Sequence, residues 1–129
     1  MTDIDESVEV TAHMFQQRVA KQYDVRLTAV DQSHFATRID IGRADLVDWR
    51  SDYAGLTYTV LPNIPREVDT GVRELLRRLS LRYAAIDFAV AADDAWYFLD
   101  LNANGQWAWL QDATGQAISR HRGRACRCQ

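Results

Sequence analysis

The chain has 129 residues, 47% of them hydrophobic and 26% charged, with a formal net charge of -3 at pH 7. This length and composition are typical of one domain with a modest core, and they argue against two independent domains. The nearly balanced charge argues against a nucleic-acid partner and against a disordered acidic chain. No apolar run is long enough for a signal peptide or a membrane segment, so no membrane partner is expected.

Charge is concentrated at the two ends of the sequence. Residues 1–12 contain acids and no base, whereas residues 120–129 contain arginines and no acid. Both ends are interpreted as solvated tails, which leaves residues 13–119 as the folded domain. The two cysteines, Cys126 and Cys128, lack a second pair of ligands at zinc-binding spacing, and so few cysteines favour a reducing cytoplasm as the location.

Alternating polar and apolar side chains predict strands in the first half of the domain. In residues 23–30 the side chains alternate from Asp24 to Ala29, with the polar ones at even positions. Residues 34–41 alternate in the same way after a polar turn, so these two segments predict a hairpin. Residues 56–60 have the β-branched and aromatic composition of another strand.

The second half predicts one helix and a second hairpin. After a break bracketed by two prolines, apolar residues recur at helical spacing from Arg66 to Ser80, and the opposite face carries a basic stripe interpreted as solvated. Residues 83–91 and 96–102 then flank a short acidic turn and predict paired strands. The expected fold class is α+β, an antiparallel sheet of hairpins packed against one main amphipathic helix.

A turn symmetric about its two aspartates would set the register of the second hairpin. It would place Val90 opposite Tyr97, Phe88 opposite Leu99, and Asp87 opposite Asp100. Because side chains alternate across a strand, Asn102 would share the acidic face. The other face is expected in the core, and its members are Ile86, Phe88, Val90, Tyr97, Leu99 and Leu101.

Like charges that face each other on a sheet are destabilising, and a bound cation would reverse that effect. Two carboxylates and an amide oxygen are hard ligands that suit magnesium, which commonly takes only one or two protein carboxylates beside water and phosphates. The alternative is a surface hairpin whose solvent face happens to carry acids. Spacing alone leaves both interpretations open.

Other residues with chemical potential give weaker patterns. His13, His34 and His121 share no spacing with one another or with the acids, so no catalytic or ligand histidine is expected. Trp107 and Trp109 favour a core position over stacking on a ligand.

The segment Ala-Ile-Asp-Phe at residues 85–88, followed by an Asp-Leu-Asn at residues 100–102, resembles the metal-binding signature of the ATP-grasp superfamily. The run Asn-Ala-Asn-Gly-Gln-Trp at residues 102–107 is similar to a motif of ATP-grasp ligases that mature ribosomally made peptides, the microviridin and graspetide type. Upstream, residues 15–17, 21–28 and 48–50 resemble the adenine-binding hinge, the Asp-x-Arg strand and the arginine loop of that family. The similarity covers roughly residues 10–119 in the family's order.

The resemblance implies an ATP- and magnesium-dependent carboxylate ligase that forms an acyl phosphate on a precursor peptide. It implies metal ligands at Asp87, Asp100 and Asn102, and a catalytic Arg26 that steadies the transferred phosphate. It also implies nucleotide contacts from Gln16, Gln17, Asp24 and Arg50.

Departures from the family pattern leave alternatives open. Asp100 replaces a glutamate, Ala103 a proline, and Ser80 and Ala84 stand where glycines are usual. The family's substrate-side domain and glycine-rich subdomain have no counterpart in this sequence, so the chain is expected to be a C-terminal fragment that works with a separate N-terminal half or a second copy. The alternatives are a RimK-like amino-acid ligase and a catalytically inactive half-domain that binds nucleotide or a partner. A half-enzyme is also expected to expose apolar surface and to self-associate.

Overall fold

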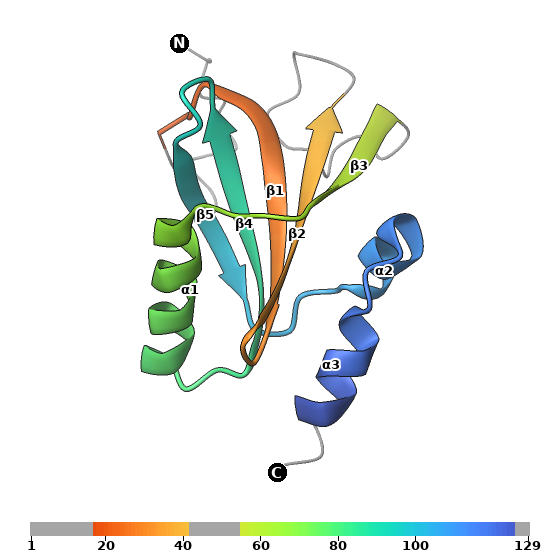
Figure 1. Cartoon of the computed structure of the whole chain (residues 1–129). Coiled ribbons are helices and arrows are strands. Elements are labelled where there is room, and N and C mark those ends of the chain that lie inside the picture. The colour runs from red at the N-terminus through yellow and green to blue at the C-terminus, as the bar shows by residue number, and fades with distance from the viewer. Residues whose placement is uncertain (1–16, 42–54, 126–129) are drawn as a thin grey trace, which may run out of the picture.

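The computed structural model describes residues 17–41 and 55–125 (Figure 1), so His13, Gln16 and Arg50 lie outside the described residues. The described part forms a five-stranded antiparallel sheet with strand order β3-β2-β1-β4-β5. Its elements are β1 Lys21–Val30, β2 Ser33–Ile41, β3 Leu56–Leu61, α1 Arg66–Arg78, β4 Tyr83–Ala91, β5 Trp96–Asn102, α2 Ala108–Thr114 and α3 Ile118–Ala125. The expected α+β class, the two hairpins and the main helix are therefore confirmed.

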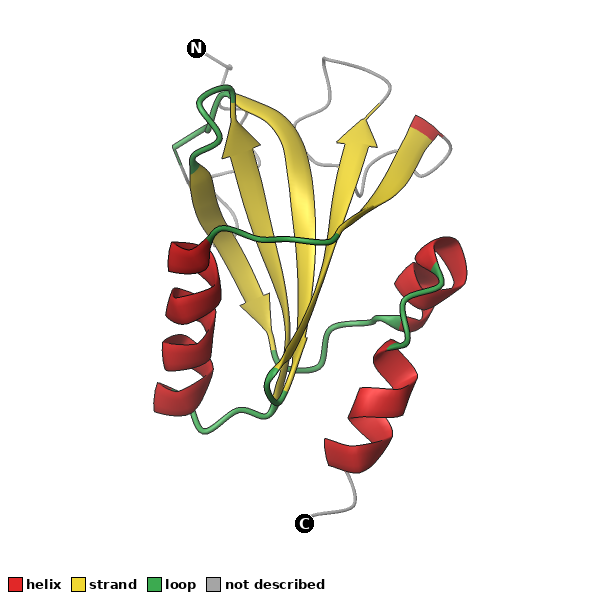
Figure 2. Ribbon diagram, in the orientation of Figure 1, coloured by secondary structure: helices red, strands yellow, loops and turns green. Residues whose placement is uncertain are grey.

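Helices cover both faces of the sheet. Figure 2 shows α1 on one side and the α2–α3 pair on the other. Two separate clusters of buried side chains correspond to these two layers, one containing Val72 and Leu76 of α1 and the other containing Leu110 of α2 and Ile118 of α3. As expected, Trp107 and Trp109 pack against the second cluster. Because both faces are covered, β1 is buried from Asp24 to Val30 although its side chains alternate in polarity.

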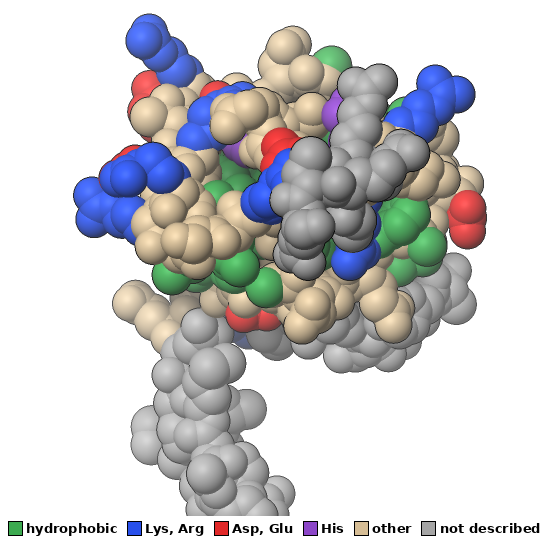
Figure 3. Space-filling model, turned by 90° about the horizontal axis from the view of Figure 1, so that it is seen from below, with side chains coloured by type: hydrophobic (Ala, Val, Ile, Leu, Met, Phe, Trp, Pro, Cys, Tyr) green, Lys and Arg blue, Asp and Glu red, His purple; other side chains and the backbone are tan. Residues whose placement is uncertain are grey.

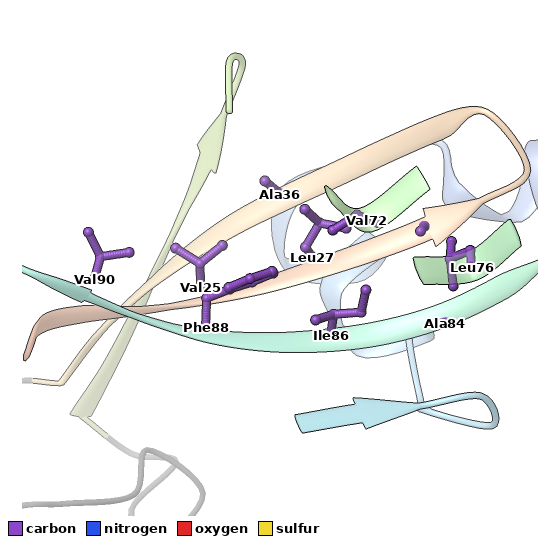
Figure 4. Close-up of a cluster of buried hydrophobic side chains, with 10 residues drawn as sticks. Val25, Leu27, Ala36, Val72, Leu76, Ala84, Ile86, Phe88 and Val90 are labelled. Carbon is purple, nitrogen blue, oxygen red and sulfur yellow. The ribbon is translucent and has the colours of Figure 1, made fainter. Parts of the chain in front are cut away.

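The larger core lies between α1 and the central strands (Figure 4). Val25 and Leu27 of β1 and Ile86 of β4 point toward Val72 and Leu76 of α1, and each of these five side chains is at most 4% exposed. The opposite face of α1 carries Arg77 and Arg78, both paired with Glu74 in solvent. Figure 3, which looks at the lower end of Figure 1, shows basic side chains projecting at the edge of the molecule. The interpretation of this stripe as a solvated face is consistent with that geometry.

The hairpin of β4 and β5 contains two irregularities that compensate each other. Its turn has three residues between Ala91 and Ala95, with Asp94 in the left-handed region at φ 61°, as in other three-residue hairpin loops. Because the loop has three residues and not two, Val90 lies opposite Trp96 and Phe88 lies opposite Phe98. The expected partners Tyr97 and Leu99 are therefore wrong. A bulge between Asp87 and Phe88 then restores the register, and Asp87 lies opposite Asp100 as predicted.

The shift moves side chains between the two faces of β5. Trp96 packs against the larger core and contacts Phe88 edge to face at 5.4 Å between ring centroids. Tyr97, expected in the core, instead pairs with Ala89 and is 46% exposed.

The C-terminal segment is more ordered than its composition indicates. Helix α3 continues from Ile118 to Ala125, so residues 120–125 of the expected basic tail belong to a helix. Residues 126–129 lie outside the described part. None of the helices in residues 17–41 and 55–125 has the length and hydrophobicity needed to cross a bilayer.

Candidate functional site

Four strands bring one row of polar residues together on the face of the sheet that carries α2 and α3. Arg26 of β1 lies directly opposite Asp87 of β4, and Asp87 lies directly opposite Asp100 of β5. On its other side Arg26 pairs with Thr37 of β2. Because direct partners in antiparallel strands project to the same face, these four side chains form a continuous row across the sheet.

Arg26 and Asp87 form a buried ion pair at the centre of this row. The guanidinium Nε lies 2.5 Å from Asp87 Oδ1, and Nη2 lies 3.2 Å from Oδ2, so both carboxylate oxygens face the guanidinium group. Only 8% of the Arg26 side chain and 9% of the Asp87 side chain are exposed. The positive charge that the facing acids require is therefore supplied, at least at Asp87, by Arg26. The facing acids in the sequence predict a metal ion as the source of that charge, and Arg26 is a source that the sequence pattern does not indicate.

Asp24 and Lys21 occupy the same strand nearer its start. Asp24 is 2% exposed, and its Oδ2 lies 2.6 Å from Nζ of Lys21, the only lysine in the chain. Asp24 precedes Arg26 by two residues in β1, so the two side chains lie on the same face of the sheet. Gln17 is exposed and precedes β1.

The segment that follows β5 folds back over β4 beside Arg26. Asn102 Oδ1 accepts a hydrogen bond from the Asn104 amide at 2.9 Å, and the Asn102 carbonyl accepts one from the Gly105 amide at 3.2 Å. Gly105 is buried, and a Cβ at this position would lie 2.4 Å from the Ala85 Cβ and 3.5 Å from Arg26 Nη1. Only glycine allows this backbone to approach β4 so closely.

Tyr83 and Arg122 hold this segment in place, although no pattern in the sequence points to them. The Tyr83 hydroxyl donates to the Gly105 carbonyl at 2.5 Å, and the Arg122 guanidinium lies 4.3 Å from the Tyr83 ring and 5.7 Å from the Trp107 ring. Burial raises the pKa of Tyr83, and the positive charges of Arg122 and Arg26 partly oppose that rise. Arg122 was assigned to a tail, and only its placement in α3 shows this contact.

Gln116 ties the α2–α3 connection to the same row. Its Oε1 accepts a hydrogen bond from Thr37 Oγ1 at 3.0 Å, and its Nε2 donates to the Ala36 carbonyl at 3.3 Å. Thr37 is the β2 partner of Arg26, so this contact fixes the edge of the row opposite Asp100. A lone glutamine in a connection offers no sequence signal for such a role.

The chemistry of the row suits a hard cation. Asp87, Asp100 and Asn102 provide oxygen donors on one face of neighbouring strands, and the last two are exposed. Among the residues that the structure describes, no three His, Cys, Asp or Glu side chains form a group that could hold a metal ion. The acidic donors number two, which matches magnesium sites that are completed by water and phosphate oxygens.

Comparisons with known proteins place this geometry in context. No protein-family model matches the sequence, and no curated protein matches it either. Among solved structures, the chain is similar to a RiPP-associated ATP-grasp ligase of Chryseobacterium gregarium in complex with ADP and with leader and core peptides. That match has 28% identity and a TM-score of 0.75, and covers 88% of this chain and 36% of the ligase.

The chain has an ATP-grasp fold. It is also similar to the macrocyclase MdnC of Microcystis aeruginosa MRC bound with precursor peptide MdnA, with 27% identity, a TM-score of 0.60, and coverage of 72% of this chain and 28% of MdnC. The ATP-grasp ligase PsnB complexed with minimal precursor, Mg and ADP gives 25% identity, a TM-score of 0.60, and coverage of 78% and 30%. The chain thus spans about a third of the length of these ATP-grasp ligases.

Six of the eight residues assigned from the ATP-grasp resemblance are described. The structure brings Arg26, Asp87 and Asp100 into one row, and Asn102 follows on the same face of β5. Asp24 lies on that face of β1, whereas Gln17 lies in the exposed segment before it. The metal, nucleotide and catalytic roles of all six remain predictions.

Proposed function

We propose that this chain forms the magnesium- and nucleotide-binding part of an ATP-dependent carboxylate ligase that acts on a ribosomally made precursor peptide. The observation that carries the proposal is the alignment of Asp100, Asp87 and Arg26 across three adjacent strands, with Asn102 beside them. The similarity to peptide ligases in complex with ADP supports the same conclusion.

The proposed reaction has two steps. The γ-phosphoryl group of ATP passes to a carboxylate of the peptide, which gives an acyl phosphate and ADP. A hydroxyl or amine of the peptide then attacks the acyl carbon, phosphate leaves, and an ester or amide forms. When bound, magnesium would offset the negative charge of the phosphates.

In this proposal the exposed Asp100 and Asn102 would offer oxygen ligands to the ion, and the buried Asp87 would offer a third. The fork of Arg26 fixes the orientation of the Asp87 carboxylate, so Arg26 acts on the ion through Asp87. This is a positioning role in addition to the proposed contact with transferred phosphate. Gly105 and Tyr83 keep the segment after Asn102 against β4, which limits how far the Asn102 side chain can move.

A second function is a nucleotide- or partner-binding half-domain without catalysis. The observation that favours it is the buried Arg26–Asp87 ion pair, because Arg26 already supplies a positive charge at Asp87 without a catalytic metal ion. The same residues would bind nucleotide in either case, so binding and turnover have to be measured separately.

Titration calorimetry with ADP tests the shared part of both proposals. ADP binding should require Mg²⁺, and Asp100→Asn should weaken it by about tenfold or more, because one charged ligand is lost. The matched control is Asp112→Asn, an exposed aspartate of α2 whose replacement should leave binding unchanged. ADP binding that is insensitive to Mg²⁺ and to Asp100→Asn would refute the metal assignment.

Product formation separates the ligase from the binding module. ATP turnover with a carboxylate-bearing peptide is measured for the chain alone and for a mixture with a candidate N-terminal half. A cross-linked peptide in either reaction supports the ligase. ADP binding without any product in both reactions supports the half-domain.

A further inference from the structure

A cavity unrelated to the acidic row lies on the α1 side of the sheet. It has a volume of about 340 Å³, which is at the lower end of the range for small-ligand sites. Its walls come from β2, from the end of β3, from residues 62–64 and from the first turns of α1. The lining residues with polar side chains are His34, Asn63, Arg66, Asp69 and Arg73.

His34 is the most deeply buried of these polar side chains. Its imidazole is 5% exposed, and Nδ1 lies 2.7 Å from Oδ1 of Asp69. Neither ring nitrogen has a hydrogen-bond partner within residues 17–41 and 55–125, and Nε2, at the opposite side of the ring from Asp69, has no ion-pair partner there either. Burying a polar atom without a partner costs free energy, and His34 lines the cavity, so this nitrogen indicates a site for a ligand atom.

The charges around His34 favour an anion. Asp69 is held by Arg73 through Nε at 2.8 Å and Nη2 at 3.2 Å, so its carboxylate is already neutralised. Arg66 lines the same cavity and forms no ion pair within the described residues. The α1 N-terminus begins here after Pro65, and no side chain caps it. The 13-residue helix therefore adds its positive dipole end and free amides to the cavity.

We propose that this cavity binds a small oxyanion, a sulfate, phosphate or carboxylate group, between His34 Nε2, Arg66 and the N-terminus of α1. The anion would accept a hydrogen bond from Nε2–H, while Nδ1 carries the proton of the ion pair with Asp69, 2.7 Å away. Both ring nitrogens are then donors, so the bound state requires the imidazolium form. The site is separate from the acidic row and does not depend on the proposed ligase function.

Proton uptake gives the site a distinctive signature. Burial lowers the pKa of His34, while the opposing charge of Asp69 raises it and that of Arg73 lowers it. The imidazole is therefore mainly neutral at pH 7 without an anion, and binding must add a proton. Affinity should rise as pH falls, by up to about tenfold per pH unit for one linked proton. Sulfate is the appropriate probe because its own charge is constant between pH 6 and pH 8.

The experiment is an NMR titration of the full chain with sodium sulfate at pH 6, 7 and 8, with chloride used to hold ionic strength constant. The imidazole nitrogen signals of His34 are assigned by their loss in His34→Gln. A saturable shift of Nε2 that grows stronger at low pH is expected. His34→Gln should abolish the pH dependence, and its fold is checked by circular dichroism.

A pair of arginine variants tests the location. Arg66→Gln should weaken sulfate binding severalfold, whereas Arg78→Gln, which removes the same charge from the other end of α1, should leave it unchanged. The same titration with O-phosphoserine tests whether the site accepts an oxyanion that belongs to a larger molecule. Serine, which lacks the phosphate group, is its control. Equal losses in the two arginine variants, or no saturable shift at His34, would overturn the proposal.

Discussion

Arg26 and Asp87 lie directly opposite each other on β1 and β4, and the guanidinium contacts both carboxylate oxygens at 2.5 and 3.2 Å. Each side chain is more than nine-tenths buried. Asp100 faces the same carboxylate from β5, so one arginine stands beside two acids. The pair therefore satisfies the charge of a buried carboxylate and holds it on the strand next to Asp100.

Replacement of Arg26 by methionine should destabilise the protein by about 3–5 kcal/mol, because the buried Asp87 next to Asp100 loses its ion-pair partner. Urea unfolding of the purified variant measures the change. The control is Arg38→Met, whose pairing with Asp40 is about one-third exposed and should contribute less than about 1 kcal/mol. If both variants lose a similar amount of unfolding free energy, the buried Arg26–Asp87 pair contributes no more to stability than an exposed pair.

Gly105 should not tolerate a side chain. In Gly105→Ala the added methyl would lie 2.4 Å from the Ala85 Cβ, so the backbone or β4 must shift at a cost of about 1–3 kcal/mol. The same shift should displace Arg26 and weaken the proposed Mg²⁺-dependent ADP binding. Thermal unfolding and calorimetry measure the two effects.

Two further variants isolate the contact. Gly71→Ala lies in α1 with nothing within 4 Å of the new methyl and should stabilise the protein by about 0.5–1 kcal/mol. Adding Ala85→Gly to Gly105→Ala removes the nearest clash and should recover part of the lost ADP binding. If the double variant binds ADP no better than Gly105→Ala, the contact with Ala85 is not the cause.

The strands and the main helix could be predicted because their signals are local. Alternation over residues 23–30 and helical spacing from residue 66 depend only on neighbouring side chains, and tertiary structure did not override them. The facing of Asp87 and Asp100 was also predicted, although through a turn geometry that was wrong. A three-residue loop and a bulge each shift the register by one residue, and their effects cancel before Asp87 is reached.

What the sequence could not show are contacts between distant segments. Tyr83 and Gly105 are 22 residues apart, and Thr37 and Gln116 are 79 apart. Neither pair contains a residue type that is diagnostic of a site. The pairing of Arg26 with Asp87 depends on β1 lying beside β4, and the order of strands in the sheet was not predicted from the hairpins alone.

Ser80 provides a stability test of a local departure from the family pattern. It follows α1 at φ 54°, and the Leu81 amide bonds to the Leu76 carbonyl in the manner of a helix-terminating motif that favours glycine. Ser80→Gly should therefore stabilise the protein by about 0.5–1 kcal/mol, because the left-handed conformation no longer strains a side chain. Ser119→Gly, within helix α3, should destabilise it. Thermal melts that rank the two variants the other way would contradict this explanation.

Stability should decline as the solution is acidified from pH 7 to pH 5 in chloride buffer. The pKa of His34 is lower in the folded protein than its usual value of 6.5, so the unfolded chain binds a proton first. Protonation therefore favours unfolding, and the loss begins below pH 6.5 and continues until the folded pKa is passed. The free energy of unfolding, measured with urea across this range, should change less with pH in His34→Gln than in the parent protein. An identical pH dependence in the variant would mean that the pKa of His34 is the same in the folded and unfolded protein.

The exposed edge of β5 should make the chain self-associate. Phe98 is 52% exposed and Tyr97 46% exposed on a strand whose one partner in the described sheet is β4. An unpaired edge strand with exposed aromatic side chains is a common association surface. Phe98→Ser should reduce the sedimentation coefficient at high protein concentration toward that of a monomer. Leu79→Ser, an equally exposed apolar position at the end of α1, should not. If both variants sediment as the parent does, the β5 edge is not the surface through which copies meet.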